Sequence, residues 1–205
     1  YACSWFDRTR FESLAKSLVF LPMAISFVGA GIIWRFVYAY RSEEQDQIGL
    51  LNQITVAFGG EPRQWLQDAP LNTLFLIVVM VWIQAGFATV VLSAAIKGIP
   101  AEIVEAAKLD GATPLQMFFR VTLPSIRPAV IVVLVTQSIG TLKLFDIVRT
   151  MTGGQFDTSV IANEMYNQAF RYGETGKGAA LAVFLFVLVT PIVIYQIRQR
   201  REAVR

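Results

Sequence analysis

The sequence predicts an all-α membrane protein with four transmembrane helices. Of its 205 residues, 55% are hydrophobic and only 16% are charged, which is typical of chains that lie in lipid. Four apolar stretches reach the roughly 20 residues that a helix needs to cross a bilayer. They are residues 14–40, 71–96, 121–142 and 178–197. Buried helices of a large soluble core fit less well, because such helices are usually shorter and the segment 73–96 carries no charge.

The distribution of Lys and Arg predicts how these helices are oriented. Basic residues gather before the first apolar stretch, between the second and third, and after the last: Arg8, Arg10, Lys16, Lys97, Lys108, Arg120, Arg127, Arg198, Arg200, Arg201 and Arg205. The positive-inside rule then places both ends and the loop 98–120 in the cytoplasm, and the loop 41–70 outside or in the periplasm. Because these residues cluster at the ends of apolar runs and form no continuous stripe, we expect no binding to nucleic acid.

Polar residues within or beside the apolar stretches are candidates for a solute pathway. They are Gln84, Gln137, Ser138, Thr141, Lys143 and Asp146, with Trp82 as a surface on which a sugar ring could stack. Polar side chains at membrane depth usually face a bundle interior or a cavity, whereas Gly, Ser and Thr also let helices pack closely. Lys143 and Asp146 could instead pair with each other. Helix packing and solute contact therefore both remain open.

The sequence lacks the residues needed for two functions, which are metal binding by His and Cys and the hydrolysis of ATP. It has no His and a single Cys3, so a disulfide within the chain and a His/Cys metal site are not available, and no catalytic residues are predicted. The string GETGKG (173–178) resembles a phosphate-binding loop but lacks its first Gly and its final Ser or Thr. We therefore expect no ATP hydrolysis by this chain.

The loop 41–70 is polar and rich in turn-forming residues, with Gly59 and Gly60 at its middle. Trp65 and Leu66 suggest a short amphipathic helix on the membrane surface. The loop is either a plain connector or a docking site for a soluble partner.

The loop 98–120 predicts a short helix with a small apolar face. Pro100 suits the first helical position, and Glu102 complements the positive end of the helix dipole. Ile103, Ala106 and Ala107 share one face, and Gly111 can end the helix by adopting a positive φ. The helix is either packed on its own bundle or held in the groove of a partner.

A second helix should follow directly. Thr113 can cap it, Pro114 fits its first turn, and Gln116 completes a capping box. Leu123 and Pro124 then lead into the third transmembrane stretch.

The spacing within this loop resembles a known signature. Glu105, Ala106 and Ala107, then Gly111, Val121 and Leu123-Pro124 resemble the EAA motif of the membrane subunits of ATP-binding-cassette (ABC) importers, with Val for the usual Ile. Other segments, among them LSAAIKGIP (92–100), LKLFDIV (142–148) and MTGGQF (151–156), resemble the maltose-type branch of sugar permeases and most of all the α-glucoside permeases. The similarity covers nearly the whole chain.

The resemblance implies a fold and a set of partners. The fold is the transmembrane domain of a type I ABC importer, formed as one permease domain by residues 1–205, with 98–120 as a cytoplasmic coupling loop. Glu105, Ala106, Ala107 and Gly111 would couple to the ATPase, and Leu123 and Pro124 would begin the third helix, with Pro124 on its hinge side. Family members carry further helices before this segment, so we expect an incomplete chain.

The implied activity is alternating access in a bacterial or archaeal cytoplasmic membrane. The partners would be a second permease subunit, two ATP-binding subunits that hold ATP and Mg, and an extracytoplasmic sugar-binding protein. This chain itself would hold no cofactor. The solute would be an α-glucoside or related oligosaccharide. The alternatives are import of a glycerophosphodiester or peptide, and a membrane scaffold without transport activity.

Overall fold

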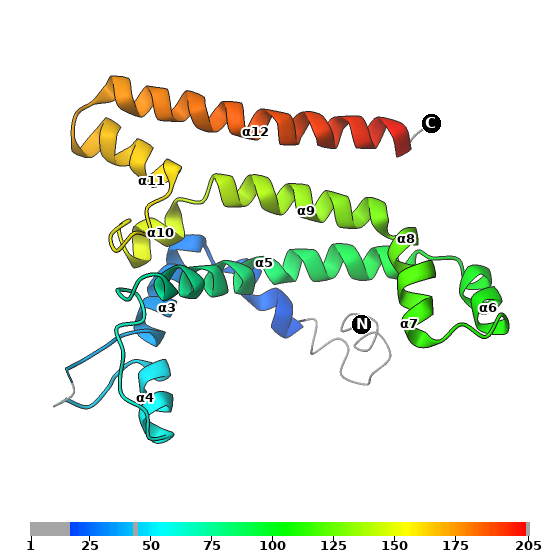
Figure 1. Ribbon diagram of the computed structural model, residues 1–205, viewed down its shortest axis with the longest axis horizontal. Helices are drawn as coiled ribbons and strands as arrows, with labels where there is room; N and C mark the ends of the chain where they lie inside the picture. The colour runs from blue at the N-terminus through cyan, green and yellow to red at the C-terminus, as the bar shows by residue number, and fades with distance from the viewer. Residues whose placement is uncertain (1–16, 43–44, 204–205) are drawn as a thin grey trace. The chain divides into compact units, whose positions relative to one another are not determined.

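The computed structural model describes residues 17–42 and 45–203, and these contain helices but no strands. The elements are η1 (Leu21–Ala24), α3 (Phe27–Val37), α4 (Leu50–Ala57), α5 (Leu71–Lys97), α6 (Ala101–Leu109), α7 (Pro114–Gln116), η2 (Met117–Thr122), α8 (Leu123–Ser125), α9 (Arg127–Leu142), α10 (Asp146–Met151), α11 (Ile161–Tyr166), η3 (Asn167–Arg171) and α12 (Thr175–Ala203) (Figure 1). The chain divides into two compact units. The described part of the first comprises residues 17–23, 84–139 and 190–203, and the second comprises residues 24–83 and 140–189.

Two helices are long and apolar enough to cross a membrane by themselves, α5 over Leu71–Lys97 and α12 over Thr175–Arg198. Two further pairs, Ser17–Ala24 with Phe27–Val37 and Pro114–Ser125 with Arg127–Leu142, meet this test only when each broken pair is taken as one span. The described residues therefore hold up to four spans. The first and third predicted spans are each formed by two helical segments with a bend between them.

Local sequence explains the first break. The Ser26 side chain accepts a hydrogen bond from the backbone N–H of Gly29 at 3.0 Å, so Ser26 caps the start of α3. The capped helix then ends at Val37, three residues before the predicted end of the first span. Residues 14–16 of that predicted span lie outside the described residues.

The core of the second unit is built by α3, α5 and α10. Its buried side chains are Ala30, Tyr38, Leu76, Val79, Met80, Ile83, Ile147, Val148 and Met151. Helix α10 packs against α3, and a Cβ added to Gly31 would lie 3.0 Å from the Cβ of Thr150. A glycine is needed there because the two helices approach closely.

The loop 41–70 is a folded structure that is organised around Asn52. This side chain is fully buried, and its amide nitrogen donates to the carbonyl oxygens of Ala39 and Arg63, both at 3.0 Å. Its oxygen accepts from the Arg63 N–H at 2.9 Å and from the Trp65 indole N–H at 2.8 Å. All four hydrogen-bonding positions of the amide are used, so one side chain ties three parts of the loop together.

The helix in this loop is not where the sequence suggested. The observed helix is α4, which precedes Gly59, whereas the stretch around Trp65 and Leu66 consists of turns. Trp65 and Leu66 pack against the core of the second unit, and Trp65 also bonds to Asn52. Their apolar surface is therefore covered by the protein itself, which removes the reason for a surface helix.

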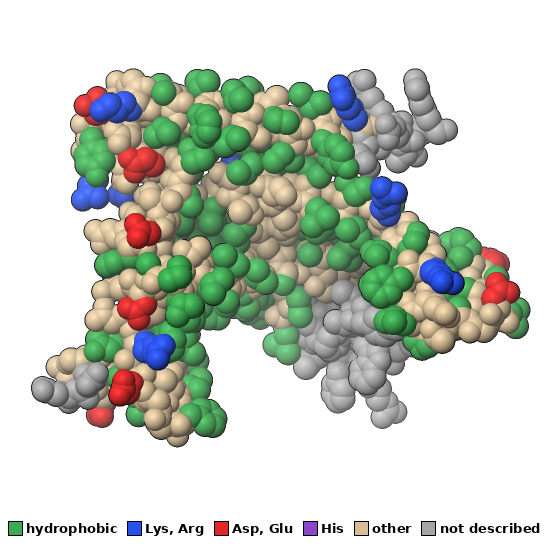
Figure 2. Space-filling view, in the orientation of Figure 1, with side chains coloured by type: hydrophobic (Ala, Val, Ile, Leu, Met, Phe, Trp, Pro, Cys, Tyr) green, Lys and Arg blue, Asp and Glu red, His purple; other side chains and the backbone are tan. Residues whose placement is uncertain are grey.

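Many large apolar side chains stay exposed along the helices. On α12 these include Val183 at 63%, Phe186 at 71% and Val187 at 58% exposure. Figure 2 shows hydrophobic side chains along α12 on this face, with charged side chains near its two ends. Such a surface is stable only against lipid or another apolar protein surface.

Candidate coupling loop and solute pathway

Helix α6 forms the first half of the loop between α5 and α9. It begins at Ala101, with Pro100 as the residue before it, so Pro100 stands one position earlier than expected. Glu102 lies in the first turn, where its charge complements the helix dipole. Glu105 and Ala106 are exposed and Ala107 is half-buried. None of the α6 residues is fully buried, so the helix presents most of its surface outward.

The end of α6 is fixed by a Schellman motif. Gly111 has φ +73°, and its N–H donates to the Lys108 carbonyl oxygen at 3.1 Å. The Ala112 N–H donates to the Ala107 carbonyl oxygen, also at 3.1 Å. These two hydrogen bonds satisfy carbonyls that a helix end otherwise leaves unpaired. The positive φ predicted for Gly111 is confirmed.

A second helical segment starts three residues later with the predicted capping box. The Thr113 hydroxyl accepts from the Gln116 N–H at 3.3 Å, and the Thr113 N–H donates to the Gln116 side-chain oxygen at 2.9 Å. Pro114 occupies the first turn, as expected. Both ends of the connection 110–113 are thus held by local hydrogen bonds.

This second segment continues through η2, a π-helix, and α8 before it bends. Pro124 lies inside the segment, and the chain turns by 70° two residues later at Ile126, whose φ is −94°. Pro124 and Pro128 have no N–H, so the carbonyls of Arg120 and Pro124 lack their usual helical donors. Helix α9 therefore begins at Arg127, and the bend within this pair of segments lies at Ile126, not at Leu123-Pro124.

Helix α6 packs against η2, so the two halves of the loop form one folded element. Several of its apolar side chains project outward instead of into this contact. They are Ile103, Leu109, Leu115 and Phe119, with exposures of 47%, 89%, 61% and 57%. In Figure 1, α6 and α7 lie beyond the C-terminal end of α5. The loop thus offers an exposed apolar surface on a locally rigid support.

The candidate solute residues of the first unit include one contact between helices. The Gln137 side-chain nitrogen on α9 donates to the Gln84 carbonyl oxygen on α5 at 3.4 Å. Ser138 is exposed, and its hydroxyl donates to the Leu134 carbonyl of its own helix at 2.8 Å. This hydrogen bond from the Gln137 side chain to the Gln84 backbone helps to join α5 to α9. It fits the interpretation that Gln137 serves helix packing.

The candidate solute-pathway residues of the second unit differ from one another in their surroundings. Trp82 is half-buried and makes an edge-to-face contact with Trp34 at 5.5 Å, so it packs on the core. The Thr141 hydroxyl lies 4.0 Å from the Met80 sulfur. Lys143 is exposed and Asp146 opens α10, and among the described residues no ion pair joins them. The structure does not bring these four residues together as one group.

A cluster that the sequence analysis missed lies on α10, α11 and η3. The Arg149 guanidinium donates to the Asn167 side-chain oxygen at 3.0 Å and lies 4.7 Å from the centroid of the Tyr166 ring. Tyr166 also contacts Phe145 and Phe170. The spacing of Tyr166 and Phe170 at i and i+4 was the signal available in the sequence. No group of three or more possible metal-binding side chains occurs within the described ranges.

A family assignment follows from comparison with known proteins. Residues 7–202 match the family described as binding-protein-dependent transport system inner membrane component. The chain belongs to this family. The prediction of an importer permease from the spacing around Glu105 and Gly111 is thereby confirmed at the level of the family.

Two curated relatives are about half identical to the chain. The osmoprotective compounds uptake permease protein GgtC of Synechocystis sp. is 50% identical over 193 residues, which is 94% of this chain and 69% of that protein. The alpha-glucoside transport system permease protein AglF of Rhizobium meliloti is 51% identical, again over 94% of this chain but only 57% of that protein. The chain thus spans 69% of the length of the first relative and 57% of the length of the second.

Solved structures support the same fold. A bacterial ABC transporter that imports the acidic polysaccharide alginate matches with a TM-score of 0.84 and 24% identity, covering 98% of this chain and 70% of that one. An alginate transporter in complex with an alginate pentasaccharide-bound periplasmic protein matches with a TM-score of 0.82 and 25% identity. The predicted all-α fold of a type I importer transmembrane domain is confirmed.

Proposed function

We propose that this chain is part of the permease subunit of an ABC importer that moves an α-glucoside or a related oligosaccharide across a bacterial or archaeal cytoplasmic membrane. The observation that carries the proposal is the doubly capped, exposed coupling loop around Gly111, found in a member of an importer family. The 51% identity to an alpha-glucoside permease supports the choice of solute.

In this proposal the loop receives the force that separate ATP-binding subunits generate. Two such subunits would bind ATP and Mg, and their closure would move α6 together with η2, because these two elements pack on each other. The motion would reach α9 through the bend at Ile126, where the two prolines leave helical hydrogen bonds unmade. Glu105, Ala106 and Ala107 would lie in the ATPase groove, since small side chains allow close approach. Leu123 and Pro124 would transmit the movement as part of the segment 114–125.

The remaining partners follow from the same assignment. A second permease subunit would cover exposed apolar faces of the helices, and an extracytoplasmic sugar-binding protein would deliver the solute. A related transporter that was crystallised with its ligand-bound periplasmic protein supports the choice of a binding protein as a partner. A chain without its own phosphate-binding loop fits a transport subunit whose ATP is hydrolysed elsewhere.

The proposal is tested by uptake in proteoliposomes that contain the full-length protein, its partner subunits and the cognate binding protein. We expect ATP-dependent uptake of at least one radiolabelled α-glucoside from a panel of maltose, trehalose and sucrose. The 50% identity to a permease for osmoprotective compounds favours a second candidate solute class, so the panel also includes glycine betaine, an osmoprotectant that is not a saccharide. Uptake of a glycerophosphodiester or a peptide, with none of the saccharides, would refute the sugar assignment.

A further inference from the structure

Three aromatic rings stand in series, with Phe145 directly before α10, Tyr166 on α11 and Phe170 on η3. The ring centroids of Phe145 and Tyr166 are 5.3 Å apart, and those of Tyr166 and Phe170 are 5.2 Å apart. Phe145 and Tyr166 are half-buried, whereas Phe170 is 75% exposed. The series therefore runs from the packed interior of the second unit to a ring that faces outward.

A cation is fixed beside the middle ring. The Arg149 guanidinium lies 4.7 Å from the centroid of Tyr166 and donates one hydrogen bond to Asn167, whose side chain is only 7% exposed. Arg149 stands on α10, which is anchored by the buried side chains of Ile147 and Val148. A guanidinium has five N–H donors, so further N–H groups remain beside the Tyr166 ring after the one that bonds to Asn167. The group is held in place before any ligand arrives.

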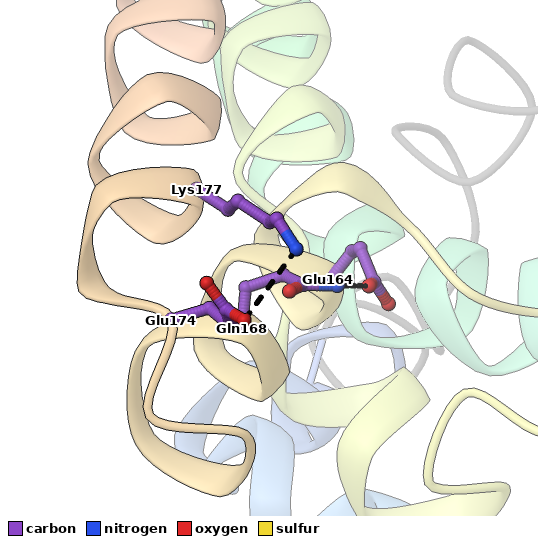
Figure 3. A network of polar contacts seen from close by, with 4 residues as sticks. All are labelled: Glu164, Gln168, Glu174 and Lys177. Atoms are coloured by element: carbon purple, nitrogen blue, oxygen red, sulfur yellow. Dashed lines mark hydrogen bonds and ion pairs between the residues drawn. The ribbon is translucent and has the colours of Figure 1, made fainter.

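The surroundings of this group are polar. Figure 3 shows Glu164 and Gln168 on α11 and η3, and Glu174 and Lys177 at the start of α12. The Gln168 side-chain nitrogen donates to the Glu164 carboxylate at 2.6 Å, and Lys177 pairs with Glu174 at 3.6 Å. The Glu164 carboxylate and the exposed pair of Lys177 and Glu174 would be costly to bury in hydrocarbon, which favours a position in water for the segment 164–177.

The predicted topology places this segment on the outer side. Residues 143–174 join α9 to α12, and the loop 98–120 at the other end of α9 is the one predicted to be cytoplasmic. A solute delivered from outside therefore meets this segment before it reaches the membrane interior.

We propose that Phe170, Tyr166 and Arg149 form an outer contact surface for the imported saccharide. Phe170 offers an exposed aromatic ring that contacts the Tyr166 ring, and Tyr166 in turn carries the fixed guanidinium of Arg149. An apolar face near polar donors is the combination that binding sites for amphipathic ligands use. One apolar face of a pyranose would lie on Phe170, and the Arg149 N–H groups would donate to its hydroxyl oxygens. This inference rests on the proposed function and assigns residues to the first contact with the solute.

The first test compares variants of the full transporter complex in proteoliposomes, with labelled maltose, trehalose and sucrose as probes. Phe170→Ala should lower uptake at subsaturating loaded binding protein by about three- to tenfold, the effect of losing one aromatic contact. Phe170→Trp should retain uptake because it keeps an aromatic face. Phe58→Ala is the matched control, since Phe58 is 89% exposed in the same unit but lies outside this cluster.

Arg149→Lys tests the polar half of the surface. Lysine keeps the charge but loses the planar set of donors, so the KM for the loaded binding protein should rise more than kcat falls. A structural role of Arg149 alone would instead lower the amount of assembled complex without a change in KM.

A second measurement separates a saccharide surface from a buried interface. Phe170→Cys, made with Cys3→Ser, should react from outside with a membrane-impermeant maleimide in the assembled complex. Labelling only after detergent treatment would place residue 170 in lipid or against the second permease subunit and would overturn the inference. Loss of co-purifying subunits in Phe170→Ala would overturn it as well.

The outcomes also distinguish this inference from the proposed function. If the wild-type complex takes up none of the saccharides, the proposed function fails and this inference fails with it. If the wild type takes up a saccharide and Phe170→Ala is indistinguishable from it, only the assignment of this surface is wrong.

Discussion

Replacement of Gly111 offers the sharpest test of the coupling loop, because the structure isolates a single physical cause. Gly111 has φ +73°, and a Cβ added there would meet no atom within 4 Å. Within this chain, a side chain at this position therefore causes no clash, and its cost comes from the backbone conformation. A substitution thus acts on the geometry of the turn between α6 and α7 and on nothing else nearby.

The expected cost follows from this geometry. A left-handed conformation costs an ordinary L-residue roughly 1–2 kcal/mol, and more for a β-branched residue such as Val. Unwinding the turn would avoid that strain but would lose the Schellman hydrogen bonds of Gly111 and Ala112, each worth about 1 kcal/mol. Since every 1.4 kcal/mol is a factor of ten, the population with the correct turn should fall by roughly five- to thirtyfold.

The assay is uptake and ligand-stimulated ATP hydrolysis by the reconstituted complex. We expect activity to fall in the order Gly, Asn, Ala, Val at position 111, because Asn tolerates the left-handed region better than other residues. Gly98→Ala is the matched control, because Gly98 has no positive φ and its added Cβ would have only ordinary contacts at 3.5 Å. Wild-type uptake by Gly111→Val would show that this turn does not transmit the coupling motion.

Three further changes test other parts of the structure. Asn52→Ala should lower the free energy of unfolding by about 3 kcal/mol, because four hydrogen bonds in a part-buried setting are lost. Thermal unfolding followed by tryptophan fluorescence measures this change, and Gln53→Ala at an exposed position is the control that should change little. Glu105→Lys should reduce co-purification of the ATPase and sugar-stimulated ATP hydrolysis, with Glu105→Gln intermediate, whereas unchanged values for both would contradict the coupling role. Gly86→Leu should destabilise the first unit by about 1–3 kcal/mol, because even a Cβ at this position would lie 2.8 Å from the Val19 carbonyl oxygen. The control is Gly176→Ala, whose Cβ would meet nothing within 4 Å and which should leave the melting temperature unchanged.

The long apolar helices and the local signals of the coupling loop could be predicted from the sequence. The second span, predicted as 71–96, is observed as Leu71–Lys97, since a long uncharged run has no other stable structure in lipid. The end of α6 at Gly111 and the capping box of Thr113 were predicted because each depends only on residues three to five positions apart.

Features that depend on distant contacts could not be predicted in this way. The hydrogen bonds of Asn52 reach Ala39 and Arg63, residues 13 and 11 positions away, and nothing in the local sequence indicates that this side chain is buried. The same applies to Trp65, which was expected on a surface helix and instead contacts Phe75 and Asn52. The cluster of Arg149 and Tyr166 joins α10 to α11 across a turn whose path the sequence does not specify.

By itself, the sequence determined that the chain is an α-helical membrane protein, where its helices are capped, and that it carries the loop of an importer permease. These properties depend on hydrophobicity and on hydrogen bonds between near neighbours, which act in any tertiary context. Only the tertiary structure decided where the third span bends, how the loop 41–70 is held, and which aromatic ring contacts Arg149. Those features arise from packing between segments far apart in the chain, and packing selects one arrangement among many that the local sequence permits.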